Sequence, residues 1–312
     1  MKIFVKKIVL LFVLTAIIFF SFFFWLISHE PIFSTSYTAS IFDKYERLCE
    51  INEPKIVLIA GSNFAFGINS QIIQEAFHMP VVNLGLQASW GMNPMLNITK
   101  DHINEGDIII LGFEYHLYNS PDANYELIVN TLESNINFYR QIVDINNIFP
   151  LTASYVQYFC NNFYDITNEN THSYVGPYSR DSFNEYGDNN YDRPQFIAEN
   201  IPTRYLSVNE KNVSTDAITY LNDYAEFVQD NKAHVYITFA STNELVFAPD
   251  SNIDAFIQHI EKYVNIPIIS NPYEYIYPCD YFFDGDGNHH LNNNAIQIRT
   301  QQLINDIRKV LT

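Results

Sequence analysis

The residues of this chain best suited to chemistry are a serine near its start and a histidine–aspartate cluster near its end. Ser62 lies in the turn Gly61–Ser62–Asn63, directly after an apolar segment, and the cluster spans 284–292. A serine is a weak nucleophile until an imidazole removes its proton, and the imidazole works best when a carboxylate fixes its tautomer. The two pieces therefore predict a hydrolase or acyl transferase, provided that the fold brings both ends of the chain together.

The order of apolar runs predicts which elements position these residues. Strands are expected at 56–60, 81–84, 108–112, 234–239 and 266–269, and helices at 70–77, 93–103, 125–148, 215–228, 253–263 and 293–311. Strands and helices that alternate at this spacing predict an α/β fold, a three-layer α/β/α sandwich with a parallel, flavodoxin-like sheet. Ligands of such sheets bind at the carboxyl ends of the strands, where Ser62 is expected to lie.

The N-terminal segment has a different character from the rest of the chain. Lys2, Lys6 and Lys7 precede a charge-free apolar run from Ile8 to Ile27. At about 1.5 Å per residue this run is about 30 Å long, which matches the hydrocarbon core of a bilayer. A cleaved signal peptide is the alternative, but its apolar region is shorter, about 7–15 residues. We expect an uncleaved transmembrane helix with the lysines in the cytoplasm and the remaining chain outside.

Three regions are expected along the chain. Residues 1–28 form a cytoplasmic stub and membrane anchor, 29–53 a tether with a lead-in helix, and 54–312 the α/β domain. Within that domain the helical and strand periodicity is lost at about 160–208, which predicts a cap over a site or an insertion. Its tyrosines are candidates for stacking on sugar rings or for packing on their own domain.

Composition and charge exclude some classes of partner. The chain has 312 residues, 47% of them hydrophobic, and a formal net charge of −18. Nucleic acids and anionic lipid surfaces are bound by basic faces, so neither is expected as a partner. The odd number of cysteines, three without CxxC spacing, predicts neither a disulfide framework nor a zinc site.

Four blocks of sequence resemble, in order and spacing, those of the SGNH (GDSL-like) hydrolase superfamily. They are 59–67 (IAGSNFAFG), 83–85 (NLG), 112–114 (GFE) and the cluster 286–290. The chain is most similar to the membrane-anchored extracytoplasmic branch, which includes the teichoic-acid D-alanyl transfer and alginate acetyl-transfer proteins. This resemblance implies that Ser62 is the nucleophile, His290 its base and Asp286 the carboxylate that orients the base. It also implies an oxyanion hole from the backbone N–H groups of Ser62 and Gly85.

The sequence departs from that pattern at Glu114. The family places there an asparagine that donates to the oxyanion, whereas an ionised glutamate only accepts hydrogen bonds. Losing one such donor costs on the order of 10²–10³ in rate. Either Glu114 does a different job, or Gln87 or Asn93 replaces the donor, or the site is slow or inactive. Asn63, next to the nucleophile, is a further candidate site residue.

The spacing within the cluster is the second departure. The commonest family pattern pairs the aspartate with a histidine three residues later, which would be His289. The continuation His290–Leu291–Asn292 instead favours His290, four residues after Asp286, with Asp284 as another candidate carboxylate.

The same cluster also resembles the opening of a calcium loop. The loop's sixth and twelfth positions, however, hold His289 and Ala295 rather than glycine and glutamate, so no metal or other cofactor is expected.

The resemblance implies a reaction on small acyl esters of a cell-envelope glycan outside the membrane, as an esterase or an O-acyltransferase. The expected partners are the glycan or an acyl donor, the membrane through the N-terminal helix, and, as a further candidate, an acyl-transporting membrane protein. The alternative is an anchored glycan-binding or envelope-assembly protein that keeps the fold with a degraded site.

Overall fold

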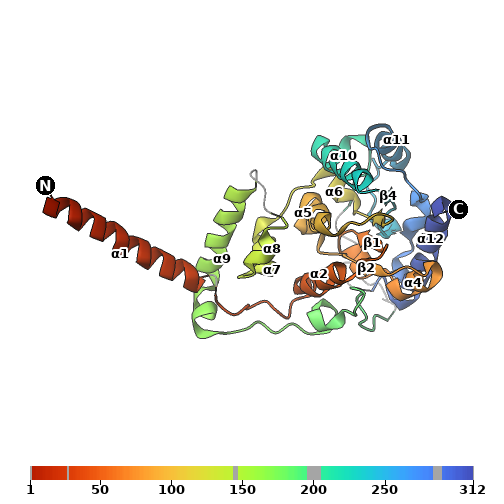
Figure 1. Cartoon of the computed structure of the whole chain (residues 1–312). Coiled ribbons are helices and arrows are strands. Elements are labelled where there is room, and N and C mark those ends of the chain that lie inside the picture. Colours follow the sequence, from red (N-terminus) through yellow and green to blue (C-terminus); the bar gives the residue numbers. More distant parts are fainter. Residues whose placement is uncertain (1, 27, 143–146, 195–204, 284–289, 312) are drawn as a thin grey trace. The chain divides into compact units, whose positions relative to one another are not determined.

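The computed structural model describes residues 2–26, 28–142, 147–194, 205–283 and 290–311. The chain divides into two compact units. Unit 1 comprises 1–34 and 125–173, and unit 2 comprises 35–124 and 174–312 (Figure 1). All three cysteines are free thiols.

Unit 2 contains a parallel four-stranded sheet in the order β2-β1-β3-β4. The strands are β1 (Ile56–Ile59), β2 (Val81–Asn83), β3 (Ile108–Leu111) and β4 (His234–Ile237). A separate two-stranded sheet pairs β5 (Thr242–Asn243) with β6 (Ile276–Tyr277). Every residue of β1, β2 and β3 is buried, as expected for parallel strands covered on both faces. The predicted α/β class and parallel sheet are confirmed.

The helices of unit 2 connect these strands. They are α2 (Ile41–Glu50), α3 (Ser62–Ala65), α4 (Ser70–Phe77), α5 (Met92–Asn97), α6 (Tyr115–Asn119), α10 (Thr215–Asp230), α11 (Ile253–Tyr263) and α12 (Asn293–Leu311). One apolar cluster joins alternate residues of β1 and β3 to α4 and α12 (Figure 1). That contact brings the last helix of the chain against the first strand–helix unit. Ser62 and the residues just before α12 therefore lie at one edge of the sheet.

Most predicted elements of unit 2 have the expected positions. The helices at 70–77, 253–263 and 293–311 have the predicted bounds, and each of the four main strands begins where the sequence predicts. The predicted helix at 93–103 is shorter, because α5 ends at Asn97 and a separate 3-10 turn follows at 100–102. The predicted strand at 266–269 is reduced to a single parallel bridge between Ile268 and Ile237 of β4.

Unit 1 is helical. It contains α1 (Lys2–Leu26), α7 (Tyr125–Leu132), α8 (Ile136–Tyr139) and α9 (Ile148–Asn168). A buried glutamate, Glu133, accepts hydrogen bonds from the backbone N–H groups of Ile32 (2.6 Å) and Phe33 (2.9 Å) and from the hydroxyl of Tyr158 (2.7 Å). It therefore ties the 32–33 segment to α9.

The predicted transmembrane helix is not confirmed. Across the stretches that the structure describes, none of the helices combines the length and the apolar character needed to cross a membrane.

Two predictions for the segments of unit 1 were wrong. The helix expected over 125–148 is interrupted, because Glu133 after α7 adopts a left-handed conformation (φ 46°). The loss of periodicity expected from residue 160 does not occur there either, since α9 continues to Asn168.

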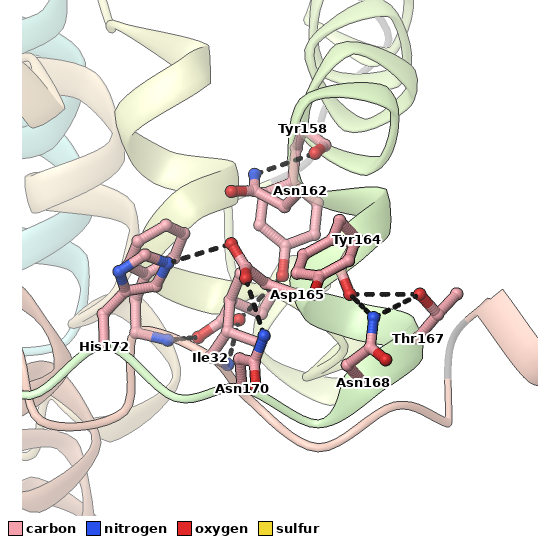
Figure 2. Close-up of polar contacts among 11 residues, drawn as sticks. Ile32, Tyr158, Asn162, Tyr164, Asp165, Thr167, Asn168, Asn170 and His172 are labelled. Carbon is pink, nitrogen blue, oxygen red and sulfur yellow. Dashed lines mark hydrogen bonds and ion pairs between the residues drawn. The ribbon is translucent and has the colours of Figure 1, made fainter.

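The polar residues of α9 explain why its helix was missed. Leu151, Tyr158 and Ile166 are buried at helical spacing, but asparagines and threonines lie between them. Their side chains return to the helix's own carbonyls: Asn162 donates to Tyr158 O (2.8 Å) and Asn168 to Tyr164 O (2.7 Å). Beyond the helix, His172 and Asn170 fold back onto Asp165 (Figure 2). Such back-bonding side chains fit a helix although their residue types favour turns.

Candidate active site

Ser62 begins α3 at the carboxyl end of β1, and its hydroxyl contacts a histidine from the other end of the chain. Ser62 Oγ lies 2.8 Å from His290 Nε2. This is within the range expected for a nucleophile and its base, about 2.6–3.2 Å. The expected pairing of Ser62 with His290 is present. It arises because the residues after β1 and the residues before α12 meet at the same edge of the sheet.

The His290 ring is held by two aromatic residues. The ring of Phe66 stacks on it, with centroids 4.3 Å apart and planes 17° apart. The hydroxyl of Tyr178 lies 3.2 Å from His290 Nδ1. When Nδ1 carries the proton and donates it to Tyr178, Nε2 is left as the acceptor that faces the serine hydroxyl. Tyr178 belongs to the 160–208 segment, so part of that segment contacts His290. Its role as a cap stays a prediction.

Three of the expected site residues, Asp284, Asp286 and His289, lie outside the described residues. The carboxylate role of Asp286 or Asp284 therefore stays a prediction.

Glu114 lies three residues after the end of β3, immediately before α6, and is fully buried. Its Oε2 accepts the backbone N–H of Gly61 (3.1 Å) and its Oε1 accepts that of Asn63 (3.1 Å). Both of its carboxyl oxygens therefore accept a hydrogen bond. Glu114 thus binds the backbone N–H groups of the residues on both sides of Ser62. The sequence left several alternatives open for Glu114. These contacts favour the one in which Glu114 has a role other than oxyanion donor, namely that it anchors the turn containing Ser62.

The close approach of Glu114 explains the glycine before the serine. A Cβ added at Gly61 would lie 2.2 Å from Glu114 Oε2, nearer than real Cβ contacts come. Any side chain at position 61 would therefore push the carboxylate away from the turn. Gly61 and Glu114 form one structural unit, although they lie in separate blocks of the sequence.

Asn63 anchors the turn from its other side. Its side-chain amide donates to Gly112 O (2.8 Å), and its Oδ1 accepts from Arg299 Nη2 (2.7 Å). Arg299 Nη1 also donates to the backbone oxygen of Asn63 (2.8 Å). Asn63 is therefore a positioning residue, with its side chain directed into the protein.

Arg299 was missed by the sequence reasoning. It lies on α12, is fully buried, and also donates to Ser241 Oγ (3.1 Å) and Phe239 O (3.1 Å) after β4. Burial lowers the pKa of its guanidinium, an effect partly offset by Tyr277, Tyr275 and Glu114. Arg299 connects the turns after β1 and β4 through one cation. A single arginine in a mixed polar helix predicts a solvent-facing residue, and no sequence signal distinguishes this one.

Gly85 lies beside α3, and its expected part in an oxyanion hole stays a prediction. A Cβ at Gly85 would meet the backbone nitrogen of Ala65 at 2.3 Å. Its own N–H, however, donates to Asn83 Oδ1 (2.9 Å), so a developing oxyanion would have to compete with that acceptor. Its carbonyl accepts from the buried Lys44 ammonium (2.6 Å). Burial lowers the pKa of Lys44 to about 7, and the nearby carboxylates of Asp188 and Asp43 offset part of this effect.

Gln87 and Asn93 follow in the same loop region. Gln87 precedes a short 3-10 turn at 88–90, and Asn93 lies in the first turn of α5. Both are half-buried, and neither side chain forms a hydrogen bond with another described residue. Their proposed replacement of the missing donor stays a prediction.

Within the described residues, no group of three or more histidine, cysteine, aspartate or glutamate side chains is arranged to hold a metal ion. The calcium-loop alternative involves 284–289 and falls outside those residues.

The comparisons with known proteins add no evidence about this site. No family model matches the chain, and no curated protein matches it significantly.

Proposed function

We propose that this chain is a serine esterase or O-acyltransferase that acts on small acyl esters of a cell-envelope glycan. The observation that carries the proposal is the 2.8 Å contact between Ser62 Oγ and His290 Nε2 at the carboxyl edge of a parallel sheet. The anchoring of the serine turn by Glu114 gives it further support, since a fixed nucleophile needs fixed flanking peptides. The resemblance of the four sequence blocks to SGNH hydrolases provides the substrate class.

The reaction follows from the geometry of the pair. His290 Nε2 takes the proton of Ser62 as Oγ bonds to the acyl carbon and the carbonyl electrons move onto oxygen. When the carbonyl re-forms, the ester's alkoxide leaves and takes the proton from His290, so the acyl group remains on Ser62. Water, or a sugar hydroxyl, then attacks the acyl-serine, and His290 removes its proton and returns it to Ser62. Hydrolysis and transfer differ only in that second acceptor.

A fluorophosphonate probe tests whether Ser62 is activated. We expect the full-length chain to be labelled at Ser62 and to hydrolyse p-nitrophenyl acetate. Ser62→Ala and His290→Ala should each abolish turnover, and the double variant should lose little more, because the two residues act as a unit. Ser89→Ala, an exposed serine in the loop after β2, is the matched control and should behave as wild type. Turnover that survives Ser62→Ala would contradict the mechanism.

A second candidate function is favoured by the oxyanion region. Glu114 occupies the place of the family's asparagine donor, and the Gly85 N–H already has an acceptor. A protein with these features could bind an envelope glycan without turning it over. Absence of both label and turnover, together with glycan binding that Ser62→Ala leaves unchanged, would favour this anchored binding or assembly protein.

The proposed location rests on the sequence from Lys2 to Ile27. We propose that this segment anchors the chain with its N-terminus in the cytoplasm and unit 2 outside, where the glycan and an acyl-transporting membrane protein would be its partners. A reporter fused after Thr312 should be active only outside the cytoplasm, and the protein should stay with membranes in an alkaline wash. Release of a shortened soluble form would mean that the segment is a cleaved signal.

We also propose that the parallel sheet has a flavodoxin-like strand order and is the middle layer of a three-layer α/β/α sandwich. The strand order β2-β1-β3-β4, with the bridge of residue 268 beside β4, supports the flavodoxin-like order. Helices α4 and α12 share one apolar cluster with alternate residues of β1 and β3, which supports one outer layer of a three-layer sandwich.

A further inference from the structure

A cavity lies in unit 2. Its volume is about 390 Å³, within the range of pockets that bind small ligands, about 300–1,000 Å³. It is formed by the segment between α3 and α4, the loop 184–193 and the first turn of α12. No step of the proposed ester reaction uses these walls.

Hydrogen bonds fix the carboxylates of this cavity in place. Asp188 is buried, and its two oxygens accept the backbone N–H and the hydroxyl of Ser70, each at 2.6 Å. Asp192 Oδ1 accepts from the side chain of Asn293 (2.6 Å). The buried guanidinium of Arg193 lies in the same wall. The wall therefore has no excess of positive charge to attract an anion, and the chain as a whole is strongly acidic.

Carboxamide side chains of the same cavity retain capacity for hydrogen bonds. Those of Asn190 and Gln297 form none with any described residue, and those of Asn69 and Asn184 use only the oxygen, for the backbone N–H groups of neighbouring residues. An amide group offers two donors and an acceptor, which matches vicinal hydroxyl groups better than it matches an ion.

The remaining lining is apolar or aromatic. Ile68 and Ile296 are buried side chains of the wall, and Tyr191 keeps 44% of its surface exposed. A pyranose ring presents both hydroxyl groups and C–H faces. It therefore matches a cavity that combines unused amides with apolar surface.

We propose that this cavity binds a neutral pyranose unit of a glycan. The inference deepens the proposed function and rests on it, because it assigns a place to the sugar whose ester Ser62 would attack. Arg193 connects the two sites: it lines the cavity, and its Nη1 donates to Phe66 O (2.7 Å). The ring of Phe66 in turn stacks on His290. Arg193 and Phe66 thus connect the wall of the cavity to the imidazole.

Saturation-transfer NMR tests this site on the full-length chain in a detergent without sugar headgroups. The probes are glucose, galactose, mannose, N-acetylglucosamine and, as the anionic comparison, glucuronate, each at about 10 mM, a concentration that detects millimolar affinity. We expect transfer to at least one neutral sugar. The double variant Asn190→Ala/Gln297→Ala should weaken its binding about tenfold or more. The control double variant Asn161→Ala/Gln258→Ala removes exposed amides elsewhere and should leave binding unchanged.

Labelling of Ser62 by a fluorophosphonate separates this proposal from the proposed ester function. Sugar binding that depends on Asn190 and Gln297 supports the cavity even if Ser62 is never labelled. The proposal is overturned if no neutral sugar shows transfer, if transfer survives the double variant, or if glucuronate binds in preference to the neutral sugars.

Discussion

The sharpest prediction concerns Glu114→Gln. Glutamine keeps the length of the side chain, so its oxygen can still accept one of the two N–H groups bound by Glu114, each now at 3.1 Å. Its NH₂ group would face the other N–H, donor against donor. Leaving a buried donor unsatisfied costs about 1–3 kcal/mol. In a unit of this size each kcal/mol lowers the melting temperature by about 2–4 °C, so we expect a fall of about 2–12 °C.

Turnover should fall as well. Glu114 holds the backbone N–H groups of the two residues that flank Ser62, and a displacement of a reacting group by about 1 Å costs about 10²-fold in rate. We therefore expect hydrolysis of p-nitrophenyl acetate to fall by about 10–100-fold in Glu114→Gln. The surface variant Glu261→Gln, exposed on α11, carries the same chemical change and should leave both stability and turnover unaltered.

Glu114→Asn decides between the anchor and a decayed oxyanion donor. Asparagine is one carbon shorter and cannot span both N–H groups, so the anchor predicts a loss of stability and of turnover. A rise in turnover with Glu114→Asn, or a Glu114→Gln protein indistinguishable from Glu261→Gln, would refute the reasoning.

Two further predictions concern buried charges. The Lys55–Asp107 ion pair is 2.9 Å long and fully buried, so Asp107→Ala should cost about 3–5 kcal/mol in urea denaturation. The exposed pair Lys232–Glu105 is the control, and Glu105→Ala should cost at most about 1 kcal/mol; equal losses would contradict the argument. Burial lowers the pKa of Lys44 from 10.5 to about 7 in the folded protein. Between these two pH values Lys44 is therefore protonated to a greater extent in the unfolded chain than in the folded one. Its contribution to stability should therefore rise with pH above about 7, and Lys44→Met should flatten the difference in melting temperature between pH 7 and pH 9.

The sequence was sufficient to predict which segments converge. Runs such as 56–59 and 108–111 are apolar throughout and mostly β-branched, which is typical of buried parallel strands. Once the strands are parallel, the residues after each strand meet at one edge. The proximity of Ser62 to the residues before the last helix therefore follows from topology, and the choice of His290 rested on the continuation His290–Leu291–Asn292.

The sequence could not show what holds the serine turn. The role of Glu114 depends on two N–H groups turned toward one point, and that geometry exists only after β1 and β3 are paired in register. Arg299 was equally hidden, because two of its partners are backbone oxygens, of Asn63 and Phe239, which carry no residue-specific signal. Helix α9 was obscured for a related reason, since its polar side chains bond to its own carbonyls.

Asn63 shows how these hidden contacts act together. Its N–H donates to the carboxylate of Glu114, whereas its carbonyl accepts from the cation of Arg299. The two opposite charges bind the two ends of one residue, and the Asn63 side chain is fixed between Gly112 and Arg299. The peptides around Ser62 therefore have few ways to move. The serine hydroxyl, in contrast, is directed at His290. A turn that only connected a strand to a helix would need neither a buried carboxylate nor a buried guanidinium, each of which is costly to remove from water. Their presence beside a serine whose hydroxyl faces an imidazole favours a site in which the position of Ser62 matters.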